Sequence, residues 1–114
     1  MRKLLFIALA LTLLAATACY SATITFQWDY DAASEAELGA AGGFKLFQSK
    51  TSQSYGTTPV LTVGPSARGG TVTVPSGTYF WVVVAFDSEG NESEKSNEVT
   101  KRVLPNKPNN LKIP

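Results

Sequence analysis

The segment from Tyr79 to Ser93, YFWVVVAFDSEGNES, constrains the fold more than any other part of the chain. Its first eight residues are apolar, and successive side chains of a strand point to opposite faces of a sheet. The two faces would carry Tyr79, Trp81, Val83 and Ala85 on one side and Phe80, Val82, Val84 and Phe86 on the other. Because both faces are apolar, we predict a central strand, and the Gly90-Asn91 pair after it predicts a hairpin turn with positive φ.

Residues 1–21 have the pattern of a secretory signal peptide. Arg2 and Lys3 form a positive start, Leu4 to Leu14 an apolar run, and Ala15 to Ala18 a small-residue region before the cleavage site. The apolar run is shorter than the about 20 residues that a membrane-spanning helix needs. We therefore expect export to the periplasm, the cell surface or the extracellular space.

Cys19 is the only cysteine, and its fate depends on where the signal peptide is cleaved. The small residues before Cys19 resemble a bacterial lipobox, although Ala16 stands where leucine is usual. Acylation of Cys19 would attach the protein to a membrane, whereas cleavage after Ser21 or Ala22 would leave a chain without cysteine. Both outcomes stay open, and neither permits a disulfide within one chain.

The rest of the chain is long enough for one small domain. We expect that domain over residues 22–104, followed by a proline-containing tail over residues 105–114. The formal net charge is +1, without a clustered basic patch of the kind that nucleic acids require. Nucleic acid is therefore not an expected partner.

Alternation and turn signals predict six short strands. The expected ranges are 23–30, 44–48, 59–63, 71–74, 78–87 and 97–103. The segment from Asp31 to Gly43 is expected to be a loop with a helical turn near Ser34 to Leu38 but no packed element. Pro59 predicts an edge position for the third strand, because proline cannot donate to the ladder. Six strands at this spacing indicate an all-β sandwich.

These residues resemble the fibronectin type III domains, particularly the bacterial and phage versions. The resemblance rests on Trp28, on the GFKLF strand from Gly43 to Phe47, on Tyr79, and on the run AFDSEGNESEKSNEV from Ala85 to Val99. It implies an immunoglobulin-like β-sandwich with Trp28 in the core and the Tyr79 hydroxyl bonded to nearby backbone at a strand corner. Domains of this architecture serve many unrelated roles, so the resemblance leaves the function open.

The chain departs from the family pattern at its start. Such a domain ordinarily opens with a further strand, but here the Trp28 strand begins at Thr23, so the usual first strand is absent at the N-terminus. In the tail PNKPNNLKIP, Leu111 and Ile113 alternate as a donor strand would. The seven residues before Leu111 reach at most about 23 Å, which favours delivery to a neighbouring molecule over self-insertion. A frayed tail is the alternative.

A second candidate surface lies on the outer face of the sheet that contains the long strand. Phe47, Phe80, Val82 and Val84 would form an apolar patch beside Lys45, and such patches often bind partners. The alternative is that the Asp31 to Gly43 loop, or side-chain stems from the last strand, cover this face.

Catalysis and metal binding find little support in the sequence. The chain has no histidine and its one cysteine is Cys19, so neither a Ser-His nor a Cys-His pair can form. The acidic residues fall in or beside predicted loops: Asp29, Asp31, Glu35, Glu37, Asp87, Glu89, Glu92 and Glu94. Asp87, Glu89, Asn91 and Glu92 could offer oxygen ligands to calcium, but their spacing does not match an EF-hand and a hairpin turn accounts for them. We predict no enzyme, cofactor or metal.

Three functions follow, in order of preference. The first is a non-catalytic exported binding or adhesion module with a protein or carbohydrate partner. The second is a structural subunit that self-associates head to tail by donating its C-terminal strand. The third is an accessory protein or inhibitor of a secreted enzyme. A membrane is a partner only if Cys19 is acylated.

Overall fold

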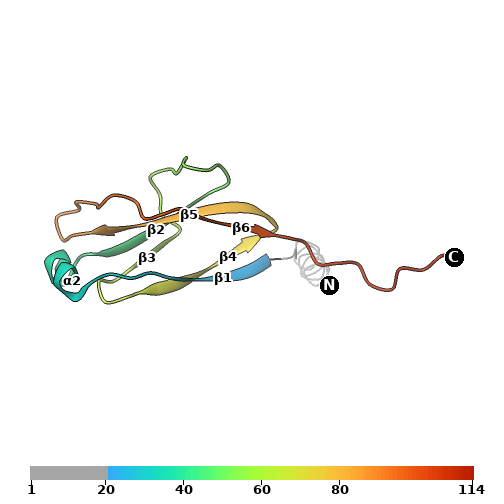
Figure 1. Ribbon diagram of the computed structural model, residues 1–114, viewed down its shortest axis with the longest axis horizontal. Coiled ribbons are helices and arrows are strands. Elements are labelled where there is room, and N and C mark those ends of the chain that lie inside the picture. The colour runs from blue at the N-terminus through green and yellow to red at the C-terminus, as the bar shows by residue number, and fades with distance from the viewer. Residues whose placement is uncertain (1–20) are drawn as a thin grey trace, which may run out of the picture.

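The computed structural model describes residues 21–114, which form two antiparallel sheets packed face to face (Figure 1). The elements are β1 (Ser21–Gln27), α2 (Ala32–Leu38), β2 (Gly43–Ser49), β3 (Leu61–Val63), β4 (Gly69–Pro75), β5 (Gly77–Phe86) and β6 (Val99–Val103). One sheet has the order β1-β4 and the other β3-β2-β5-β6. The predicted all-β sandwich and its six strands are confirmed, with strand ends shifted by a few residues.

The long strand β5 is central, as its two apolar faces predict. It lies between β2 and β6, with Leu46 opposite Val83 in the β2 register. Trp81 is 1 % exposed and packs with Leu46 and Val74 in the main core between the sheets. Half-buried side chains of β1 complete this core from the other sheet.

The two-stranded sheet leaves β1 with a neighbour on one side only. β4 pairs with it along its whole length, and beyond Gln27 the Trp28 N–H still donates to the Arg68 carbonyl at 3.0 Å. Backbone groups of successive strand residues point alternately to the two neighbours, so those of Gln27 and Asp29 point to the other edge of β1. No strand among residues 21–114 pairs with that edge. At the far side of the larger sheet, β3 is also an edge strand, as Pro59 predicts.

The segment after β1 contains helix α2, so the predicted helical turn near Ser34 to Leu38 is confirmed, whereas the prediction that the segment has no packed element is wrong. Asp31 caps α2 by accepting the Ser34 N–H at 2.7 Å, and this bond lowers the pKa of its carboxyl. Leu38 at the helix end is buried against Phe44 and Ala85, and Gly39 then ends the helix with φ 77°. The burial of one leucine gives α2 a tertiary contact that a seven-residue helix needs.

The predicted tyrosine hydrogen bond is present. The Tyr79 hydroxyl donates to the Pro75 carbonyl at 2.9 Å across the turn between β4 and β5, and its ring stacks on Trp81 with centroids 5.8 Å apart. Trp28 lies at the margin of the core, where it is half-buried and packs on Phe44 at 5.5 Å.

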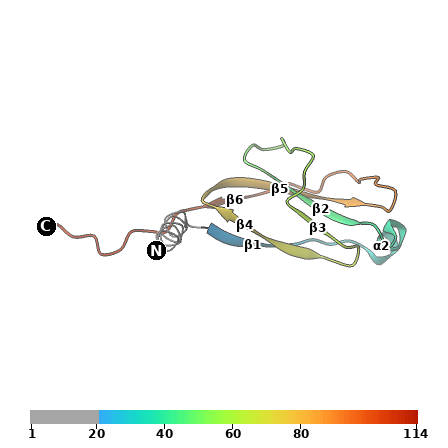
Figure 2. The same ribbon diagram turned by 180° about the vertical axis from the view of Figure 1, so that it is seen from behind.

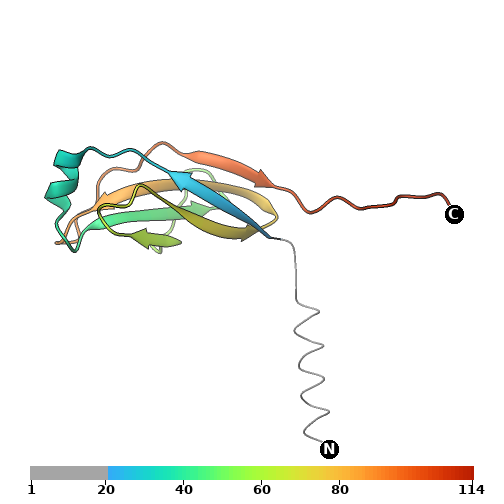
Figure 3. The same ribbon diagram turned by 90° about the horizontal axis from the view of Figure 1, so that it is seen from below.

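The tail leaves the sandwich at the end opposite α2 (Figures 1 and 3). Residues 104–114 contain no helix or strand, and Leu111 and Ile113 are each 98 % exposed. The expected signal peptide lies outside the described residues except for Ser21, which already belongs to β1, and Cys19 lies outside them too. No helix within residues 21–114 is long and apolar enough to span a membrane.

Candidate functional site

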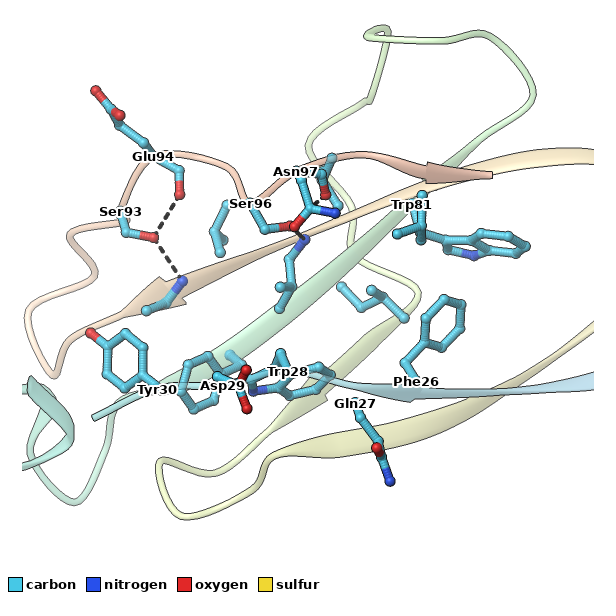
Figure 4. Close-up of a pocket in the computed structure, with 17 residues that line it drawn as sticks. Phe26, Gln27, Trp28, Asp29, Tyr30, Trp81, Ser93, Glu94, Ser96 and Asn97 are labelled. Carbon is cyan, nitrogen blue, oxygen red and sulfur yellow. Dashed lines mark hydrogen bonds between the residues drawn. The ribbon is translucent and has the colours of Figure 1, made fainter. Parts of the chain in front are cut away.

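A groove runs between the unpaired edge of β1 and the chain segment that leads into β6 (Figure 4). Its volume is about 470 Å³. One wall is residues 26–30, the other is formed by Ser93, Glu94, Ser96, Asn97 and Val99, and the floor is the inner face of β2 and β5. The two sheets are therefore open toward solvent along this side of the sandwich.

The floor of the groove is apolar and incompletely covered. Val83, in the middle of β5, is only half-buried, although Trp81 and Ala85 on the same face are 1 % and 6 % exposed. On the β1 side, the Phe26 ring meets Trp81 edge-on at 5.0 Å and is half-buried itself. An inner-face residue of a central strand is normally buried, so the exposure of Val83 marks a position that a further element could cover.

The wall opposite β1 is held by serine side chains instead of a regular strand. Ser96 N–H donates to the Val83 carbonyl at 2.9 Å, while the Val83 N–H donates back to Ser96 Oγ at 3.0 Å. Ser93 makes the same pair of bonds with Ala85, at 2.8 and 2.9 Å, and Figure 4 shows the one that involves Ser93 Oγ. The β5 backbone is thus satisfied beyond the end of β6, and this wall is fixed.

The polar groups of the groove leave it with an acidic rim. Asp29 stands on one wall and Glu94 on the other, and the lining contains no lysine or arginine. The indole nitrogen of Trp28 is buried without a hydrogen-bond partner among residues 21–114. Buried donors are nearly always paired, so Trp28 indicates a place where a partner group is missing.

Arg68 fixes Tyr30, the last residue of the β1 wall, at the end of the groove near α2. This end is called the mouth of the groove. Its guanidinium donates to the Tyr30 carbonyl at 3.3 Å, forms an ion pair with Glu35 of α2, and lies over the rings of Tyr30 and Phe44. Sequence reasoning missed this residue, because nothing in its local sequence distinguishes an arginine that binds distant segments from an exposed arginine in a turn.

The apolar patch predicted on the outer face of the larger sheet is not exposed. Phe47, Val82 and Val84 are 6 %, 2 % and 4 % exposed, and Phe80 is half-buried. The cover is Tyr55, from the loop between β2 and β3 that projects over this face (Figure 2). Thr100 of β6 also lies directly opposite Phe80, and the patch is not a candidate site.

One carboxylate anchors that covering loop. Glu98 accepts hydrogen bonds from the Ser52 hydroxyl at 2.6 Å, the Gln53 N–H at 2.8 Å and the Tyr55 hydroxyl. The three donors lower the pKa of Glu98, and the Ser52 hydroxyl makes the largest contribution. Burial and the neighbouring Glu98 carboxylate raise the pKa of Tyr55. Glu98 is also absent from the sequence-based candidates, since its donors lie more than forty residues away.

The acidic turn after β5 forms a closed hydrogen-bonded hairpin. Asp87 accepts the Asn91 side-chain amide at 3.1 Å and the N–H groups of Asn91 and Glu89 at 2.9 and 3.0 Å, and these bonds lower its pKa. Glu92 pairs with Lys45 at 2.8 Å. Gly90 has φ 89°, so the hairpin interpretation of Gly90-Asn91 is confirmed. Within residues 21–114 no three metal-ligating side chains lie close enough together to hold an ion.

The predicted donor residues and the groove lie apart within one chain. Leu111 and Ile113 are in the exposed tail, beyond the end of β6, and the groove mouth at Tyr30 is near α2 at the other end (Figures 1 and 3).

Comparisons with protein-family models, with curated proteins and with solved structures find no match for this chain.

Proposed function

We propose that the protein is a non-catalytic, exported binding module of the fibronectin type III type, and that it captures an extended peptide strand at the β1 edge. The observation that carries this proposal is the groove itself, with unpaired backbone groups along one wall and the half-buried Val83 in an apolar floor. In strand addition, main-chain hydrogen bonds supply affinity and pockets for alternate side chains supply specificity.

The strand order supports the family assignment. A two-stranded sheet facing a four-stranded one is what a fibronectin type III sandwich would show if its opening strand, the neighbour of β1, were removed. The Tyr79 bond to Pro75 agrees with the corner that the resemblance implies. An edge that lost its neighbour exposes a row of N–H and C=O groups, which readily pair with another strand.

The shape of the groove favours a strand over a compact ligand. Its volume falls in the range of small-molecule sites, but it follows an edge and is walled by main chain on both sides. Its charged lining groups, Asp29 and Glu94, lie on opposite walls, and the chain has no histidine to act as a base beside a nucleophile. Binding is the role that these groups can perform.

The test uses the chain from Ser21 to Leu104 as bait for a displayed library of decapeptides. This shortened chain keeps every strand, because the tail belongs to no sheet and is exposed throughout. We expect enrichment of alternating apolar sequences, lost in Gln27→Pro and kept in Gln27→Ala. Proline removes the N–H that points to the free edge, whereas alanine removes only the side chain. A library that yields no peptide sensitive to Gln27→Pro would contradict the proposed function.

A further inference from the structure

We infer that the strand captured by the β1 edge is the C-terminal tail of a second copy of this chain, so that copies associate head to tail. This inference rests on the proposed function and names its ligand. The tail supplies two apolar side chains at alternate positions, Leu111 and Ile113, and each is 98 % exposed in the isolated chain. The apolar floor of the groove could bury both side chains, which would otherwise remain in contact with water.

Charge complementarity supports the same pairing. The tail from Pro105 to Pro114 carries Lys107 and Lys112 and no acidic residue. Among the residues that line the groove, Asp29 and Glu94 are acidic and none is basic; Arg68, beside Tyr30, is already paired with Glu35. The opposite charges of the tail and the groove lining therefore favour their association.

Chain direction selects a neighbour as the donor. A strand antiparallel to β1 must enter near Tyr30 and run toward Ser21. Because a strand rises ~3.3 Å per residue, Tyr30 and Ser21 are about 30 Å apart. The tail starts beside the opposite end, since Val103 pairs with Gly77 near the start of β1 (Figure 1). The residues 104–110 span at most about 23 Å, so the tail cannot reach the mouth of its own groove. A copy stacked end to end places its mouth where the tail leaves.

The alternation of both strands defines a register. Inward side chains lie opposite inward side chains in an antiparallel pair, so Leu111 would face Trp28 and Ile113 would face Phe26. Lys112 then lies opposite Gln27 and exchanges main-chain hydrogen bonds with it. The Lys112 side chain points outward, diagonally beside Asp29.

The decisive experiment is disulfide trapping between two singly substituted chains. Residues 21–114 contain no cysteine, and hydrogen-bonded antiparallel partners lie about 5.5 Å apart at Cα, which suits a disulfide. We expect a mixture of Gln27→Cys and Lys112→Cys chains to form a covalent heterodimer under mild oxidation. Thr62→Cys, on the exposed edge strand β3, is the matched control and should not cross-link to Lys112→Cys.

Sedimentation velocity over a concentration series supplies the affinities. The chain from Ser21 to Pro114 should form growing oligomers, while the chain ending at Leu104 should stay monomeric. Leu111→Ser or Ile113→Ser should weaken association roughly ten- to hundredfold, and Lys112→Glu roughly two- to fivefold, with recovery when Asp29→Lys is present in the accepting copy.

The outcomes separate this inference from the proposed function. If the chain is monomeric with or without its tail but still enriches decapeptides that bind the β1 edge, the inference would be overturned and strand capture would remain supported. Monomers without any edge-binding peptide would overturn both. A double variant, Gln27→Cys with Lys112→Cys, that closes only within one chain would show self-insertion and would also overturn head-to-tail association.

Discussion

At the scale of single residues, Glu98 shows how one side chain decides which surface the sandwich presents. Its carboxylate gathers Ser52, Gln53 and Tyr55, and Tyr55 in turn covers Val82 and Val84. Without these hydrogen bonds, the outer face of the larger sheet would expose the apolar patch that the sequence suggests.

The anchoring by Glu98 should depend on pH. Because its pKa is lowered on folding from an ordinary value of 4.5, its contribution is present above that value and is lost as the pH falls through the folded-state pKa. The raised pKa of Tyr55 acts at the other end: its contribution is present below the ordinary value of 10.0 and lost as the pH rises through the folded-state pKa. We expect faster exchange of the Gln53 amide proton at a pH below the lowered pKa of Glu98 than at neutral pH, after correction for the intrinsic rate.

Two variants test this assignment by amide exchange in NMR. Glu98→Gln should remove the acid-dependent change while leaving the β-sheet amides protected. Tyr55→Phe should keep the ring over Val82 and Val84, and its loop should still loosen in acid through the Gln53 bond. An unaltered acid response in Glu98→Gln would assign the response to another carboxylate.

Residues such as Glu98 and Arg68 mark the limit of prediction from sequence. The Tyr79 hydrogen bond was expected from the resemblance to fibronectin type III domains, and its partner Pro75 is only four residues away across a turn. Glu98 and Arg68 instead bind donors and acceptors more than thirty residues distant, in loops and in α2, so their roles depend on the folded path of those segments. The groove was only half predictable: the sequence suggests that β1 has a free edge, and no strand among residues 21–114 pairs with that edge, but the walls and acidic lining require the structure.

At the scale of elements, patterns of alternation were enough for strands and not for the helix. Strands β1 and β5 repeat apolar residues over seven and ten residues, so their existence is strongly specified. Helix α2 has one buried residue, Leu38, and its stability comes from packing on Phe44, which no local pattern reveals. The same limit applies to the loop that carries Tyr55.

The serine segment that completes the larger sheet gives a prediction at this scale. Ser93→Ala and Ser96→Ala each remove the acceptor for a β5 N–H group, so each should lower the free energy of unfolding by about 1 kcal/mol, measured by urea denaturation. Ser66→Ala is the matched control, because Ser66 is exposed and its hydroxyl makes no hydrogen bond among residues 21–114. Stability equal to the control would mean that water in the groove replaces the serine hydroxyls.

At the scale of the whole molecule, α2 and the tail lie at opposite ends of the sandwich (Figure 1), and the groove-lining residue Tyr30 directly precedes α2. A donor at one end and an acceptor at the other make a heterologous contact, which extends into filaments unless rotation closes a ring. Moving the donor to the start of the chain should abolish this growth. The rearranged chain would carry Asn109 to Pro114, a flexible linker of about six residues, and then residues 21–104.

In the rearranged chain the donor strand runs antiparallel to β1 and fills the groove of the same molecule. Covering Leu111 and Ile113 contributes about 1.5–3 kcal/mol each, and ordering the new strand offsets much of this gain. We expect a monomer at every concentration whose melting temperature exceeds that of the chain ending at Leu104 by roughly 4–8 °C for each kcal/mol gained. The same rearrangement with Leu111→Ser and Ile113→Ser should gain nothing, because its strand has no side chains for the apolar floor. If both rearranged chains melted together with the shortened chain, the β1 edge would not be a strand acceptor, and its exposed floor would need another explanation.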